Sequence, residues 1–106
     1  MSGLSEVGFV ALSAALLAVG LFGILTRRNF ILLLVAIEIA MNAAILNFVY
    51  FAAFAPTSPG GLSGQAIAVV LVGFAATEVA VGLAIVLALN RAKGTINVAE
   101  ATELRL

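Results

Sequence analysis

The sequence predicts an all-α integral membrane protein built from three transmembrane helices. Hydrophobic residues make up 64% of the chain and charged residues only 9%, whereas charged residues are roughly a quarter of a soluble domain. Three apolar stretches, each long enough to cross a bilayer core of about 30 Å, are separated by short polar or basic segments. With a length of 106 residues, we expect residues 1–106 to form a single membrane domain.

The first span is expected over residues 7–25, where it meets a basic segment that contains Arg27 and Arg28. A secretory signal peptide has its basic residues before the apolar stretch, but here they follow it and Glu6 precedes it. We therefore expect residues 7–25 to remain in the protein as a transmembrane helix.

The second span is expected over residues 30–54, because the APTSPGG segment that follows is rich in helix-breaking Pro and Gly. Aromatic residues gather near the end of this span, as they do in a membrane aromatic belt: Phe48, Tyr50, Phe51 and Phe54. The third span, residues 62–89, is long for a bilayer, so it is expected to tilt or to begin near Gln65. Residues 90–106 are expected to form a tail.

The basic residues predict the orientation of the three spans. Arg27 and Arg28 lie between the first two spans, Arg91 and Lys93 follow the third, and the loop between the second and third spans has no charge. Since short cytoplasmic loops carry an excess of Lys and Arg, the N-terminus is expected outside, in the periplasm, and the C-terminus inside, in the cytoplasm. Arg27 and Arg28 are then topology determinants.

Composition excludes several classes of site. The chain has no cysteine and no histidine, which removes disulfides, thiolate metal sites and the usual zinc and haem ligands. Its formal net charge is zero, so no basic surface for nucleic acid is expected. We expect no metal, no cofactor and no soluble substrate bound by this chain, and the lipid bilayer as its surroundings.

Two glutamates, Glu38 and Glu78, stand in the middle of otherwise uncharged stretches of the second and third spans. An ionisable side chain at the bilayer centre costs about 2.5–3.5 kcal/mol on insertion scales, so such residues are rare and usually functional. Counting along the helices puts Glu38 roughly 15 Å from Arg28 and Glu78 roughly 20 Å from Arg91. The pair predicts a proton or ion pathway; the alternative is that each is protonated and hydrogen-bonded across a helix interface.

Neither glutamate has a basic partner within the spans of this chain. Each is expected to be neutral if it is buried without a basic partner, and ionised if another chain supplies a Lys, Arg or His. Both the neutral and the ionised state remain open. Asn42 follows Glu38 by four residues and shares its helix face, where it is expected to hydrogen-bond the carboxyl or to hold a water molecule. Asn47 lies about 180° from Glu38 around the helix and is expected to serve another contact.

Small residues recur at helical spacing, in a row along the third span and in a second group in the first: Ala68, Ala76, Ala80, Ala84 and Ala88; Ala11, Ala14, Ala15 and Ala18. Small residues let helix backbones approach closely in lipid. The rows indicate either an ordinary alanine-rich membrane protein or a subunit packed tightly inside a larger assembly.

Two segments, RRNFILLLVAIEIAMNAAILNF and GQAIAVVLVGFAATEVAVGLAIVLALNRAKGTINV, closely resemble a known family. It is the subunit K family of the proton-pumping NADH–quinone oxidoreductase, respiratory complex I, and the resemblance covers the whole chain. It implies a non-redox subunit in a bacterial inner membrane, among other membrane-arm subunits. Flavin, iron–sulfur clusters and quinone would belong to those partners.

The resemblance also implies roles for individual residues. Glu38 and Glu78 match the two membrane carboxylates of the family's proton relay, and Arg27 and Arg28 match its cytoplasmic basic loop. The chain departs from the family at Ile45, where Asn is frequent. It also departs at Thr77, where Ala is frequent, and the Thr77 hydroxyl is expected to bond a backbone carbonyl one turn back.

Three other functions compete with this interpretation. The small three-span subunit of a multisubunit cation/proton antiporter is a related transport class, but the resemblance implies that its members lack this pair of glutamates. A holin-like or purely structural membrane protein needs no mid-membrane acid and tolerates a Glu→Gln change. The rotor subunit of ATP synthase has one acid on a two-helix hairpin, which two acids on three spans argue against.

Overall fold

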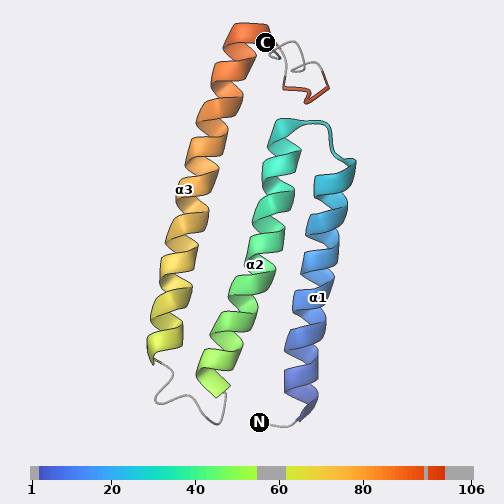
Figure 1. The fold of residues 1–106 in the computed structure, drawn as a ribbon. Helices are drawn as coiled ribbons and strands as arrows, with labels where there is room; N and C mark the ends of the chain where they lie inside the picture. Colours follow the sequence, from blue (N-terminus) through green and yellow to red (C-terminus); the bar gives the residue numbers. More distant parts are fainter. Residues whose placement is uncertain (1–2, 55–61, 95, 100–106) are drawn as a thin grey trace.

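The computed structural model describes residues 3–54, 62–94 and 96–99. Within them lie three long helices, α1 over Gly3–Thr26, α2 over Phe30–Phe54 and α3 over Leu62–Lys93 (Figure 1). Each helix is long and apolar enough to cross a membrane, which confirms the predicted three-span fold. Because α3 begins at Leu62, tilting remains the expectation for this helix, which is 32 residues long.

Polar atoms close the helix ends at the turn between α1 and α2. The Thr26 hydroxyl donates to the Phe22 carbonyl at 2.6 Å in the last turn of α1. The Asn29 side-chain oxygen accepts from the backbone N–H groups of Ile31 at 2.9 Å and Leu32 at 3.4 Å. Asn29 is therefore the N-cap of α2, and its side chain satisfies donors that the first helical turn leaves unpaired.

The C-terminal end of α3 lies later than expected. Residues 90–93, expected in the tail, continue the helix to Lys93. Gly94 then adopts a left-handed backbone conformation with φ +66°, and its N–H donates to the Asn90 carbonyl at 2.8 Å. Glycine adopts this conformation without the steric cost that a Cβ imposes, so it ends the helix. The APTSPGG segment and residues 100–106 lie outside the described residues.

The three helices form a row in which α2 lies between α1 and α3 (Figure 1). Antiparallel neighbours follow from the short connection of residues 27–29 between α1 and α2. The residues of α2 that face α1 lie on the opposite side of the helix from those that face α3. Among the described residues, no further helix covers the two broad faces of the row.

The contact between α1 and α2 depends on very small residues. A Cβ atom on Gly20 would lie 2.8 Å from both the Cβ and the backbone nitrogen of Ala40, and one on Gly23 would lie 2.6 Å from the Cβ of Ala36. At this close approach the buried Ser13 hydroxyl donates to the Ala43 carbonyl at 2.9 Å. A side-chain hydrogen bond thus joins two spans inside the apolar layer.

The predicted aromatic belt is wrong for one of its members. Tyr50 is buried at 5% exposure and stacks on Phe9 of α1, with ring centroids 4.5 Å apart. Phe48, Phe51 and Phe54 remain exposed at the end of α2. Tyr50 differs because it lies on the α1-facing side of α2, where its ring fills the space between the two helices.

Most residues of the predicted small-residue rows lie on the outer surfaces of the bundle. Ala68 is buried against α2, but Ala76, Ala80, Ala84 and Ala88 are exposed, as are the four alanines of α1. Within the chain, the close helix contacts use other small residues, among them Ser13, Gly20 and Gly82. The exposed rows are free to contact groups outside this chain.

A short stretch of the tail pairs with the α1–α2 connection. The Phe30 N–H donates to the Ile96 carbonyl at 2.9 Å, and the Val98 N–H donates to the Arg28 carbonyl at 2.7 Å. Asn29 and Asn97 are opposite each other in this antiparallel bridge. We call residues 28–30 together with residues 96–98 the tail clasp.

Candidate functional site

Glu38 lies on the face of α2 that borders α3. Its side chain is half-buried and lines a groove of about 290 Å³ in which every other lining residue is apolar. Four of these residues come from α2 and two from α3: Ile31, Leu34, Val35, Ile39, Val79 and Leu83. The groove gives the Glu38 carboxyl no polar neighbour among the lining residues.

Glu78 lies on α3 in a wider groove of about 640 Å³. This groove is also mostly apolar, and α2 contributes two of its lining residues, Leu34 and Met41. Glu78 is exposed in the chain taken alone. Thr77 lines the same groove, and its hydroxyl donates to the Phe74 carbonyl at 2.8 Å, which confirms the bond expected one turn back.

The two glutamates lie at the same level along the bundle. The Leu34 side chain of α2 contacts Gly82 of α3, and Ala52 of α2 contacts Gly64 of α3. The two contacts fit one antiparallel register, because Ala52 lies eighteen residues after Leu34 and Gly64 lies eighteen residues before Gly82. Four residues onward from Leu34 is Glu38, and four residues back from Gly82 is Glu78. The matched depth inferred by counting along the sequence therefore follows from the helix register.

Although they lie at the same level, the two carboxylates face different sides of the α2–α3 contact. Their grooves have one lining residue in common, Leu34, which lies at the seam between the helices. No hydrogen bond joins Glu38 to Glu78 in the part of the chain that the structure describes. A proton passing from one to the other would need an intervening water molecule or side chain.

The two asparagines of α2 have different surroundings. Asn42 is exposed and makes no hydrogen bond to Glu38 within the described ranges, so its supporting role stays a prediction. Asn47 lies on the α1-facing side of α2, opposite Glu38, as its spacing predicts. Its side-chain oxygen is buried and has no hydrogen-bond partner among the residues described.

The basic residues gather at one end of the bundle. Arg27 and Arg28 follow α1, Arg91 and Lys93 lie in the last turn of α3, and all four are exposed. In Figure 1 the end of α1, the start of α2 and the end of α3 lie together. We call this the basic end. The predicted orientation requires this shared location, and the side of the membrane that the basic end faces stays a prediction.

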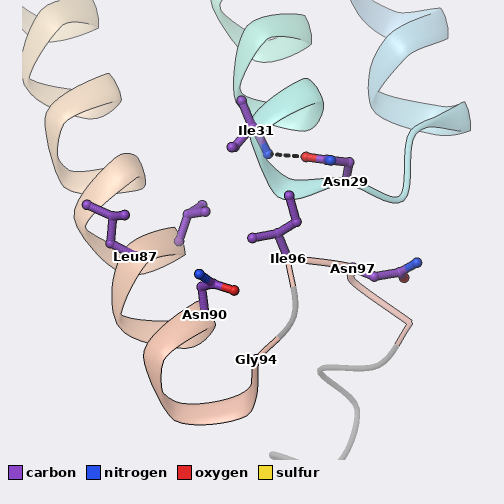
Figure 2. A pocket seen from close by; sticks show the side chains of 8 residues that line it. Asn29, Ile31, Leu87, Asn90, Gly94, Ile96 and Asn97 are labelled. Atoms are coloured by element: carbon purple, nitrogen blue, oxygen red, sulfur yellow. Dashed lines mark hydrogen bonds between the residues drawn. The ribbon is translucent and has the colours of Figure 1, made fainter.

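A pocket of about 560 Å³ lies at the basic end, between the start of α2, the end of α3 and the tail. Figure 2 shows Asn29, Asn90 and Asn97 around it, with Ile31, Leu87 and Ile96 supplying apolar lining. This arrangement was not predicted from the sequence. Asn29 directly before an apolar helix is an N-cap signal, and Gly94 is a helix-end signal, but neither indicates that the tail returns to pair with the loop.

No metal-binding cluster is present in the described residues. No group of three or more His, Cys, Asp or Glu side chains comes together there. Glu38 and Glu78 line separate grooves. What this arrangement offers chemically is a pair of isolated carboxyl groups, each able to donate a proton when neutral and to accept one when charged.

The fold and these carboxylates define a class: a small integral membrane protein of three spans, with acidic groups at matched depth on two of them. Comparison with known proteins narrows this class to a family. The profile of the family described as NADH-ubiquinone/plastoquinone oxidoreductase chain 4L matches residues 8–106, and the chain belongs to that family.

Curated relatives agree along most of their length. The chain is 45% identical over 92 residues to a protein of Anaeromyxobacter sp. (strain K), covering 87% of this chain and 89% of the relative. It is 43% identical over 97 residues to one of Syntrophobacter fumaroxidans, covering 92% and 93% of the two chains. It is 40% identical over 105 residues to one of Thermomicrobium roseum, covering 99% of each. These relatives are named NADH-quinone oxidoreductase subunit K, or subunit K 1 in Syntrophobacter.

Proposed function

We propose that this chain is a membrane-arm subunit of a proton-translocating NADH–quinone oxidoreductase and that Glu38 and Glu78 form part of its proton path. Family membership supports the assignment to the complex. The observation that carries the proton role is the helix register, which brings two carboxyl groups to one level in spans that hold no other charge. A purely structural role does not require the two glutamates to lie at one level, whereas a lateral proton path needs carboxyl groups at similar depth.

The path runs sideways across the row of helices. Glu38 opens to one side of the α2–α3 seam and Glu78 to the other, so together they bridge the two uncovered faces. Neighbouring subunits close both grooves and supply the polar or basic groups that the apolar walls lack. A carboxyl group suits this role because it receives a proton from one side and releases it to the other without any redox chemistry.

Redox chemistry belongs to the partners in this proposal. Flavin, iron–sulfur clusters and quinone are held by other subunits, and this chain contributes proton conduction alone. The partners are other membrane-arm subunits of the complex. The chain lies in a bacterial inner membrane with the basic end in the cytoplasm, which is where Lys and Arg residues of short loops accumulate.

The proposal is tested with Glu38→Gln, Glu78→Gln and the double variant in membranes that contain the whole complex. Glutamine keeps the shape and hydrogen bonding of the side chain but cannot exchange a proton. We expect Glu38→Gln to lower NADH-driven pumping and coupled quinone reduction strongly, because Glu38 is the more enclosed carboxyl. Glu78→Gln should be milder, and the double variant at least as severe as Glu38→Gln, with effects that are not additive if both lie on one path.

The control is Glu6→Gln, which removes an exposed carboxylate in the first turn of α1, outside the middle of the spans. Pumping is measured as the rate of proton uptake per amount of assembled complex, so that a loss of assembly is not read as a loss of function. Normal pumping by Glu38→Gln at normal complex content would show that Glu38 has a structural role and no role in the proton path. The same result for both glutamates would favour the structural or holin-like alternative.

A further inference from the structure

The tail clasp joins the start of α2 to the chain just beyond the end of α3. Two main-chain hydrogen bonds of 2.9 and 2.7 Å flank the Asn29–Asn97 bridge, and the left-handed turn at Gly94 directs the chain back toward α2. Figure 2 shows Ile96 and Asn97 crossing beside Asn29, away from the last turn of α3. The clasp thus links the two helices that carry the glutamates.

In the spanning parts of α2 and α3, apolar packing holds the two helices together. Small residues line part of their seam, including Gly64, Ala68, Ala75 and Gly82, and the Leu34 side chain packs beside Gly82. Across the described part of this seam no side-chain hydrogen bond is present, in contrast to the bond from Ser13 that joins α1 to α2. Van der Waals packing holds such a seam together, and a hydrogen bond adds a directional constraint on the height of one helix relative to the other.

The height of α3 relative to α2 decides whether the carboxylates stay level. A slide of one residue moves a helix by about 1.5 Å along its axis. Hydrogen bonds weaken steeply once donor and acceptor are more than about 3.2–3.5 Å apart, so this slide is enough to break a chain of proton carriers. A bond at the basic end, acting along two stiff helices, prevents the slide at Glu38 and Glu78.

We propose that the tail clasp fixes the position of the two glutamates relative to each other, and that it does so through hydrogen bonds made by the backbone groups of Phe30, Ile96 and Val98. The inference rests on the proposed proton role of Glu38 and Glu78. It assigns to the tail of this chain a role in proton transfer without any contact with the proton path. The clasp stays closed during turnover, because its purpose is to hold a fixed register.

Paired proline and alanine variants test the main-chain bonds. Val98→Pro removes the N–H that donates to the Arg28 carbonyl, and Val98→Ala keeps it while trimming the exposed side chain. Phe30→Pro removes the second donor at the first position of α2, where a helix tolerates proline, and Phe30→Ala is its control. We expect each proline variant to pump more slowly per assembled complex, by up to about a hundredfold, the loss that misplacement of reacting groups by about 1 Å can cause elsewhere. Each alanine variant should pump within about twofold of the parent, a smaller loss than such a misplacement causes.

A reversible cross-link then tests the mechanism. Asn29 and Asn97 form the non-hydrogen-bonded pair of the bridge, in which Cα atoms are about 4.5 Å apart, a distance that a disulfide spans. The chain has no cysteine of its own, so Asn29→Cys with Asn97→Cys gives a single possible pair within this chain. We expect high disulfide yield in the assembled complex, measured by blocked thiol labelling, and equal pumping by the oxidised and reduced forms.

The decisive step adds Val98→Pro to the cysteine pair. Oxidation should restore pumping to within about twofold of the parent, and reduction should abolish the gain, because a covalent link replaces the lost hydrogen bond. Failure of oxidation to rescue would mean that Val98→Pro acts through some other defect and would overturn the proposal. Low disulfide yield in the intact complex, or pumping that stops on oxidation of the otherwise unchanged pair, would also overturn it.

These outcomes are separate from those that test the glutamates. Disulfide yield reports the clasp without reference to any carboxylate, and Glu38→Gln reports the proton path without reference to the tail. If the disulfide forms in high yield and both glutamine variants pump normally, Glu38 and Glu78 have no proton role, and the clasp is only a structural link between α2 and α3. A failed rescue with inactive Glu38→Gln would remove the positioning role alone.

Discussion

Leu34 of α2 fills the space beside Gly82 of α3, with its Cδ2 atom 2.5 Å from where a Cβ on Gly82 would stand. Leu34 is also the residue that lines both carboxylate grooves. This one side chain therefore separates the two grooves and sets how closely α2 and α3 approach. Each glutamate lies one helical turn from the contact, so a change at Gly82 reaches both.

We predict that Gly82→Ala impairs pumping without preventing assembly. The added methyl group displaces Leu34, whose terminal methyl groups are able to rotate away at a cost of about 1–3 kcal/mol. Pumping per assembled complex is the measurement, and Gly73→Ala is the matched control because a Cβ on Gly73 meets nothing within 4 Å. Equal pumping by both variants would show that the seam near Leu34 does not influence the path.

Gly20→Ala is expected to be more damaging to the fold than Gly82→Ala. A Cβ on Gly20 would meet the backbone nitrogen and Cα of Ala40 at 2.8 and 2.9 Å, and backbone atoms of a helix have no rotamer to adopt. The α1–α2 contact must open, which weakens the Ser13 hydrogen bond to Ala43. Complex content in membranes, measured on native gels, should fall for Gly20→Ala and stay normal for Gly8→Ala, where the added Cβ meets nothing within 4 Å.

The Asn29 cap gives a third prediction. Asn29→Ala leaves the first N–H groups of α2 without their side-chain acceptor, which costs about 1 kcal/mol. Asn29→Asp keeps the acceptor and should retain the parent stability. The temperature at which the purified complex dissociates measures the difference, and an unchanged temperature for Asn29→Ala would show that partner subunits supply other acceptors.

Orientation is tested by thiol labelling, since the chain has no native cysteine. Single changes Ser58→Cys and Ala92→Cys place thiols in the uncharged loop and at the basic end. With the proposed topology, a membrane-impermeant maleimide added to intact cells labels Ser58→Cys alone, and inverted vesicles reverse this result. Labelling of both positions from the same side would contradict the three-span topology.

The span pattern could be predicted because it depends on length and hydropathy, which the sequence displays directly. α2 occupies Phe30–Phe54, since a capping Asn29 and a Pro- and Gly-rich segment bound it. The Thr77 hydroxyl bond and the direction of Asn47 were also predictable, because both follow from helical periodicity alone. Local geometry needs no knowledge of neighbouring helices.

Contacts between helices were less accessible to sequence reasoning. Tyr50 was expected at a membrane surface but stacks on Phe9, since its environment depends on which face of α2 meets α1. The alanine rows could not be separated from the glycines that make the actual contacts, because all of these residues are small. The tail clasp depends on pairing between residues about seventy positions apart, and no local pattern in Ile96 or Val98 indicates a partner.

The arrangement of the helices in a row has a consequence for biogenesis. Because α2 lies between α1 and α3, the described part of this polypeptide encloses no interior, and each carboxylate opens onto a groove that lacks an outer wall. On the proposed function, the conduit comes into existence only when the neighbouring subunits dock. A newly inserted copy that awaits assembly therefore does not make the membrane permeable to protons. The cell keeps its electrochemical gradient while the complex is still being assembled.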